Sequence, residues 1–291
     1  MVEYIETVLV FTLIFGLAAM SFDLLLGYAG LISLAQASFM GLGAYCTAIL
    51  VTKMGWGFFP SLVAGVVVAS ALGVIIGVAV LRLAGDYLLV GSVGFLFAVQ
   101  AVFIGWESVT GGAPGLPGVT EPMILGFRVS TPGHYLVLCL VAAAICYFLS
   151  ARLVSSPFGR CLKAMHDDEI ATLSVGKNIV SLKLWVFVIS ASMAAVSGTL
   201  YAHFVTYVDP YHYSLHETFF LFCMVCIGGL RTLKGAFLGA LLLTSIPEIT
   251  RFLGLPSGIM GHVQEIIYGT ALIAVAFIRP QGLLGKIRRE P

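Results

Sequence analysis

The chain has 291 residues, of which 59% are hydrophobic and only 10% are Asp, Glu, Lys or Arg. Because a soluble domain carries roughly 25% charged residues, this composition excludes a water-soluble globular protein and indicates an all-α, polytopic α-helical membrane protein. The net charge of +1, without a dense basic patch, also argues against a nucleic-acid partner.

Nine hydrophobic segments follow one another along the chain, and most approach the roughly 20 residues that a helix needs to cross a bilayer. We therefore expect about eight to ten transmembrane or re-entrant helices in one domain that covers residues 1–291. The seventh segment is short and is followed by Gly228 and Gly229, which favours a broken or re-entrant element. The predicted segments are 4–27, 31–52, 58–82, 87–106, 134–152, 184–206, 217–230, 235–254 and 261–279.

Small and polar residues gather at 27–43, between two otherwise apolar stretches, and one acidic residue precedes them. They are Asp23, Ser33, Gln36, Ser38, Gly41 and Gly43. Buried hydroxyls and amides need hydrogen-bond partners, and a translocation path that contains water would supply them. Helix packing through glycine is the alternative, and Asp23 either has a structural role or lines the path. A path with so few charges suits a neutral or zwitterionic solute that binds weakly.

The connection at about 107–133 is rich in glycine and proline, which favours tight turns over helix or strand. Glycine permits backbone conformations that a moving gate can use. The residues that we assign to this outer loop or gate are Thr110, Gly111, Gly112 and Gly115. A compact linker is the alternative interpretation.

The connection at about 153–183 is the longest polar segment, and its pattern predicts two short helices outside the membrane. Ser156 and Pro157 mark a helix start, and Phe158, Cys161, Leu162 and Met165 then form one apolar stripe. An acidic turn, Asp167-Asp168-Glu169, opens a second helix with Ile170 and Leu173 on its apolar side, and Gly176 can end it. Such a module either rests on anionic lipid or inserts into a partner protein. The three carboxylates favour a partner whose groove has a basic rim.

Charge placement predicts the orientation of the chain. If 153–183 is cytoplasmic and the segments alternate, 12 of the 15 Lys and Arg residues lie on the cytoplasmic side, against Lys53, Arg128 and Arg251 outside. This places the N-terminus outside and the C-terminus inside, provided that all nine segments cross. No G-x-x-x-x-G-K-[ST] phosphate loop occurs, and no catalytic or metal-binding cluster stands out.

Several motifs, taken in order along nearly the whole chain, resemble those of the permease subunits of bacterial high-affinity branched-chain amino-acid ABC importers, of the LivM type. The similar stretches are 23–45, Thr110-Gly111-Gly112 to Gly115-Leu116, 155–176, Gly228-Gly229-Leu230 and 279–285.

The resemblance implies an obligate assembly in the bacterial inner membrane. A homologous second permease would pair with this chain, two ATP-binding subunits would hold ATP and Mg²⁺, and a periplasmic binding protein would deliver leucine, isoleucine or valine. This chain itself would be neither an enzyme nor the holder of a cofactor. The residues expected to couple it to the ATPases are Phe158, Gly159, Arg160, Lys163, Asp167, Asp168, Glu169 and Gly176.

Three alternatives stay open on the sequence. Related ABC permeases carry urea or short amides. A secondary transporter driven by a proton or sodium gradient would use Asp23 as its coupling carboxylate. A membrane scaffold without transport activity is the third, and the polar interruptions at 27–38 and 228–235 argue against it.

Overall fold

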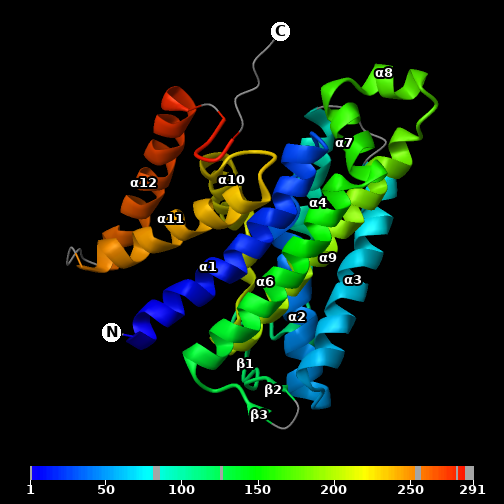
Figure 1. Cartoon of the computed structure of the whole chain (residues 1–291). Coiled ribbons are helices and arrows are strands. Elements are labelled where there is room, and N and C mark those ends of the chain that lie inside the picture. The colour runs from blue at the N-terminus through cyan, green and yellow to red at the C-terminus, as the bar shows by residue number, and fades with distance from the viewer. Residues whose placement is uncertain (1, 81–85, 125–126, 253–256, 280, 286–291) are drawn as a thin grey trace.

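A computed structural model describes residues 2–80, 86–124, 127–252, 257–279 and 281–285 (Figure 1). The elements of its first half are α1 (Val2–Asp23), the π-helix η1 (Leu24–Tyr28), α2 (Gln36–Met54), α3 (Phe58–Val80), α4 (Asp86–Gly105), α5 (Glu107–Thr110), β1 (Leu116–Pro117), β2 (Met123–Ile124) and β3 (Phe127–Arg128). Those of the second half are α6 (Pro132–Ser155), α7 (Pro157–Asp167), α8 (Glu169–Ser174), α9 (Ile179–Val205), β4 (Tyr207–Val208), the 3₁₀-helix η2 (Pro210–Tyr213), α10 (Leu215–Gly228), α11 (Leu233–Phe252) and α12 (Ser257–Ile278).

The fold is an all-α, polytopic membrane protein, as the composition predicts. Six helices within the described residues are long and apolar enough to cross a membrane: α1 continued by η1, α2, α3, α4, α6 and α9. The next two form a pair, α10 and α11, bent by 117° at a short break. The apolar part of α12 that the structure describes is shorter, Val263–Ile278. Each of the nine predicted segments therefore contains a helix, and the seventh is broken as its glycines indicate.

Several predicted boundaries are wrong by four or five residues; the sixth segment, for example, is predicted from residue 184, whereas α9 begins at Ile179. The second hydrophobic segment was placed from residue 31, whereas α2 begins at Gln36. The chain leaves the helix at Gly30, whose φ of +71° is a left-handed conformation that glycine takes readily. Hydropathy does not register this change because Leu31, Leu34 and Ala35 are apolar and buried within the connection.

The first two helices form the centre of the bundle. In their most apolar stretches, 78% of α1 and 61% of α2 are buried, against 22–28% of α3, α4 and α6. Close backbone packing holds α2 to α9, since a Cβ atom at Gly43 would overlap the carbonyl oxygen of Ala195, and one at Gly198 would overlap that of Met40. Helices α2 and α9 are therefore joined through glycine.

The last part of the bundle follows α1 back along its length. Arg231 of the turn before α11 bonds Asp23 at the end of α1, Thr244 bonds Thr12 at 2.8 Å, and Glu248 accepts from Tyr4. The helix α11 is thus antiparallel to α1 as far as Glu248. The two long connections lie at opposite ends of the bundle, with α7 and α8 at one end and β1–β3 at the other (Figure 1).

Candidate functional site

The connection between α6 and α9 has the predicted form of helix, acidic turn and helix. Ser156 caps α7 by accepting a hydrogen bond from the amide of Gly159, and Pro157 occupies the first turn. Asp168 caps α8 by accepting from the amide of Ala171 at 2.9 Å. Gly176 follows with a φ of +77°. These local features of the sequence prediction are confirmed.

The apolar stripe of α7 faces the protein. Leu162 and Met165 are buried and Phe158 is half-buried, while Arg160 is exposed. Gly159 sits against the end of α6, where a Cβ atom would overlap the carbonyl oxygen of Val154. The helix is therefore docked on the bundle by its apolar face and does not stand free.

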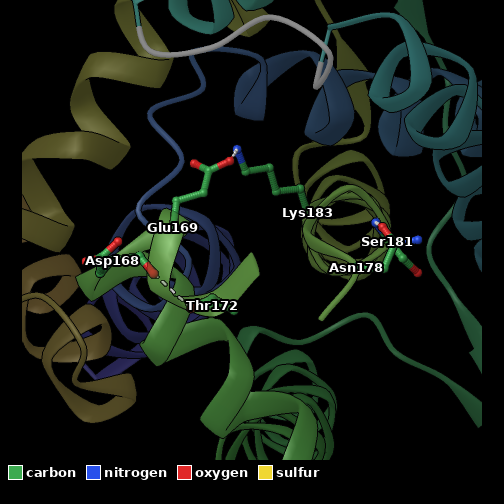
Figure 2. A network of polar contacts seen from close by, with 6 residues as sticks. All are labelled: Asp168, Glu169, Thr172, Asn178, Ser181 and Lys183. Atoms are coloured by element: carbon green, nitrogen blue, oxygen red, sulfur yellow. Dashed lines mark hydrogen bonds and ion pairs between the residues drawn. The ribbon is translucent and has the colours of Figure 1, made fainter. Parts of the chain in front are cut away.

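The three acidic residues of the turn each have a partner within this chain, and the sequence predicts only the helix cap among these contacts. Asp167 forms an ion pair with Arg231 at 2.8 Å, Asp168 caps α8, and Glu169 forms an ion pair with Lys183 at 2.7 Å (Figure 2). Their first role is to hold the connection in shape, so the acidic residues are not simply a surface left for a partner.

The outward face of α8 is apolar instead. Ile170 and Val175 are each 77% exposed and Leu173 is 54% exposed. Beside them, a groove of about 500 Å³ runs between α7 and α8. Its lining residues include Pro157, Arg160, Cys161, Ala164, Ala171 and Val175. Exposed apolar residues on a short, well-capped helix next to a groove form a surface suited to binding another protein.

Beneath α7, the break between α10 and α11 is fixed to the end of α1. Asp23 is fully buried, and its Oδ1 accepts from the backbone amide of Arg231 at 2.9 Å. The hydroxyl of Tyr28 donates to the carbonyl of Arg231 at 2.7 Å. Asp23 thus has a structural partner. The sequence leaves its role open between a structural one and a place on the path.

The segment after α12 closes the other side of this break. The amides of Leu283 and Leu284 donate to the carbonyls of Ile227 and Gly228, at 2.9 and 3.0 Å. These carbonyls belong to the last turn of α10, where no amide of the same helix is available to donate to them. Four stretches that are far apart in sequence therefore meet at one junction: 23–30, 163–167, 228–232 and 281–285. Four of the motifs that carry the family resemblance overlap it.

The residues that the sequence assigns to a translocation path lie inside this chain. Ser33, Gln36 and Ser38 are each 1% exposed. The side chain of Gln36 bonds Ser21 of α1 and Ser190 of α9, so it ties three central helices together. The hydroxyl oxygen of Ser38 is buried without a hydrogen-bond partner. Gly41 and Gly43 pack closely against η2 and α9, since a Cβ atom at Gly41 would lie 2.8 Å from Tyr213 Cγ.

The predicted outer loop is compact. Thr110 donates to the carbonyl of Phe103 at 2.7 Å, and β1 pairs antiparallel with β4, Leu116 opposite Val208. Gly111, Gly112 and Gly115 all have positive φ, between 66° and 78°. A Cβ atom at Gly111 would overlap the carbonyl oxygen of Gly115. Close packing requires these glycines, which favours the compact linker over a moving gate.

Two polar residues of interest are not singled out by the sequence. Arg231 appears there only as one positive charge among twelve, although its partners make it the centre of the junction. Glu217 is 7% exposed in the first turn of α10, and its Oε1 has no hydrogen-bond partner. A carboxylate at the start of an apolar segment after two histidines was the available signal. In the described part of the chain, no group of three His, Cys, Asp or Glu residues is placed to hold a metal ion.

A bundle of this kind, with a broken helix pair and a capped helical module at one end, defines a polytopic membrane protein whose features fit a transport subunit. The family model described as "Branched-chain amino acid transport system / permease component" matches residues 4–276. The chain belongs to this family, and it is therefore a transport component of the ABC permease type.

Individual relatives of the chain are consistent with this family. The chain is 29% identical over 303 residues to the high-affinity branched-chain amino acid transport system permease protein LivM of Escherichia coli K12, covering 96% of this chain and 69% of that protein. It is 24% identical over 291 residues to LivH of the same organism, covering 94% and 91%. It is 26% identical over 240 residues to the autoinducer 2 import system permease protein LsrC of Yersinia enterocolitica, covering 81% and 59%. No solved structure matches the chain significantly.

Proposed function

We propose that this chain is the LivM-type permease subunit of an ATP-driven importer for leucine, isoleucine and valine. The observation that carries the proposal is the family match over residues 4–276 together with the LivM and LivH relatives. The partners would be a homologous second permease, two ATP-binding subunits with their ATP and Mg²⁺, and a periplasmic binding protein. The chain would lie in the bacterial inner membrane with its C-terminus and the α7 end cytoplasmic, as its positive charges favour.

The substrate is tested by uptake. In vesicles that contain the assembled complex, we expect leucine uptake that needs ATP and the binding protein and that isoleucine and valine inhibit. Inhibition by urea or short amides alone would favour the alternative ABC permease, and the LsrC relative shows that other solutes occur among similar chains. Uptake by this chain alone, driven by a proton or sodium gradient, would contradict the proposal.

The ATPases would dock on the α8 surface, defined as Ile170, Leu173 and Val175, and in the adjacent groove. Because these side chains are 54–77% exposed, replacing two of them by a charged residue costs little folding energy but opposes burial in an interface. We expect Ile170→Glu with Leu173→Glu to abolish co-purification of the ATPases while membrane insertion persists. Ser174→Glu is the control for charge, compared with each single variant, Ile170→Glu or Leu173→Glu, since it adds one negative charge on α8 without removing an apolar contact. Loss in the control alone, or retention in both variants, would contradict the docking surface.

The path would run along 27–43, between this chain and the second permease. Since Ser33, Gln36 and Ser38 are each 1% exposed in this conformation, we expect single cysteines there to be protected from water-soluble thiol reagents at rest. Reactivity should appear when ATP is trapped on the partner subunits. Protection in every state would assign the segment to helix packing.

A further inference from the structure

Arg231 occupies a conformation that favours glycine. It lies in the turn between α10 and α11 with a φ of +61°, in the left-handed region. A side chain with a Cβ atom is disfavoured there, whereas glycine is not. A glycine would therefore form this turn more readily, and the arginine must be stabilised by its contacts.

The contacts of Arg231 divide into two sets. Its backbone holds the turn to the end of α1, through Asp23 and Tyr28 as described above. Its side chain makes two further bonds: Nε donates to the carbonyl of Gly27 at 3.0 Å, and Nη2 donates to Oδ1 of Asp167 at 2.8 Å. The backbone bonds to Asp23 and Tyr28 do not depend on which side chain residue 231 carries. The side-chain bonds are the ones that reach α7.

The end of α7 rests on the same place through neighbouring residues. The Nζ of Lys163 lies 5.5 Å from the centre of the Tyr28 ring. The ring of His166 packs against Gly30, where a Cβ atom would lie 2.8 Å from Nδ1. The last turn of α7 is therefore in contact with η1 and with the connection after it, and the ion pair extends this contact to the broken helix pair.

We propose that Arg231 is a positioning residue that makes the coupling segment, 156–176, and the broken pair α10–α11 move as one unit during transport. The inference rests on the proposed function of the chain. The side chains of Arg231 and Asp167 are 32% and 38% exposed, and ion pairs so open to water add little to stability. The guanidinium of Arg231 donates one hydrogen bond to Gly27 and one to Asp167. These two bonds fix the orientation of α7 relative to the turn.

Two variants separate the side chain from the turn. Arg231→Gly removes both side-chain bonds, keeps the backbone bonds to Asp23 and Tyr28, and suits the left-handed conformation. Asp167→Asn removes the charge at the other end of the pair. Lys234→Ala is the matched control, because it deletes an exposed positive charge three residues from Arg231 and leaves the ion pair in place.

In the reconstituted complex, the measurement is the amount of leucine imported for each ATP hydrolysed. We expect Arg231→Gly and Asp167→Asn each to lower this ratio about fivefold or more, the lower end of typical coupling between sites. The double variant should be no worse than the poorer single variant, because both act through one pair. Thermal stability and the Lys234→Ala ratio should stay unchanged. The inference would be overturned if the ratio is unchanged in Arg231→Gly. It would also be overturned if the losses of the two single variants multiply in the double variant, or if the thermal stability of the variants falls together with the ratio.

A second measurement uses the purified chain and does not depend on transport. Amide hydrogen exchange should rise in 163–168 when Arg231 is changed to glycine, and in 229–232 when Asp167 is changed to asparagine. Exchange that rises only beside the changed residue would overturn the link. Failure of the wild-type complex to import leucine, with these cross-effects present, would contradict the proposed function and leave the link between α7 and the turn standing.

Discussion

The two ends of the bundle are held by different kinds of interaction. At the α7 end, side chains join segments that are far apart in sequence, with Arg231 bonded to Asp167 and to Asp23. At the opposite end, the connection between α4 and α6 is held mainly by its backbone, with glycines in left-handed conformations and a two-residue strand pair to β4. The side chains of Lys53, His203 and Tyr207 add bonds to its carbonyl groups. We expect this difference in bonding to determine how easily each end of the bundle changes its conformation.

Side-chain bonds can be exchanged one at a time at a modest cost for each. A backbone turn packed against another backbone has no such intermediate arrangements, because tightly packed groups resist small displacements. We therefore expect the α7 end to change its contacts more readily than the outer connection. Substitutions at the two ends should differ accordingly, in size and in kind.

The largest loss of stability is expected at Gly115 of the outer connection. Its φ is +74°, and a Cβ atom would overlap the carbonyl oxygen of Val208. Gly115→Ala should cost about 3 kcal/mol, from left-handed strain and overpacking together. Gly118→Ala is the control, since Gly118 has a φ of +88° and no atom within 4 Å of its Cβ position; strain alone should cost about 1 kcal/mol. Equal shifts of the thermal midpoint in detergent would show that backbone packing does not hold this end.

A smaller loss is expected at Asp23, on the α7 end. Asp23→Ala leaves the part-buried amide of Arg231 without its acceptor, which should cost about 1–3 kcal/mol. Asp23→Asn keeps an oxygen acceptor at that place and should cost less. Thermal unfolding of both variants measures the difference. If Asn is as damaging as Ala, the negative charge of Asp23 matters more than the bond, which would revive its assignment as a coupling carboxylate.

Local signals account for what the sequence predicts well. The caps at Ser156 and Asp168 and the left-handed Gly176 depend on residues within one or two turns, so the helix–turn–helix form of 156–176 is readable in advance. Hydropathy likewise locates all nine hydrophobic segments, because the bilayer imposes their length.

What the sequence cannot supply is the set of distant partners. Glu169 and Lys183 are 14 residues apart, Asp167 and Arg231 are 64 apart, and Gln36 and Ser190 are 154 apart. Each of these side chains is polar, and polarity alone does not distinguish a surface for a partner or a solute path from an internal bond. The acidic turn and the 27–43 segment were both interpreted by polarity, and the fold gives both internal bonds.

The smallest effect is expected at the ion pair between Glu169 and Lys183, also at the α7 end. The Glu169 side chain is 51% exposed, so Glu169→Gln should cost no more than about 0.5 kcal/mol, and the cost should disappear in high salt because ions screen exposed charges. Its neighbour provides the contrast, since Asp168→Ala removes the helix cap and should cost about 1 kcal/mol. Amide exchange across α8, measured at low and high salt, tests both values. A large effect of Glu169→Gln that persists in salt would mean that this end is as rigidly fixed as the outer connection, and the distinction between the two ends would fail.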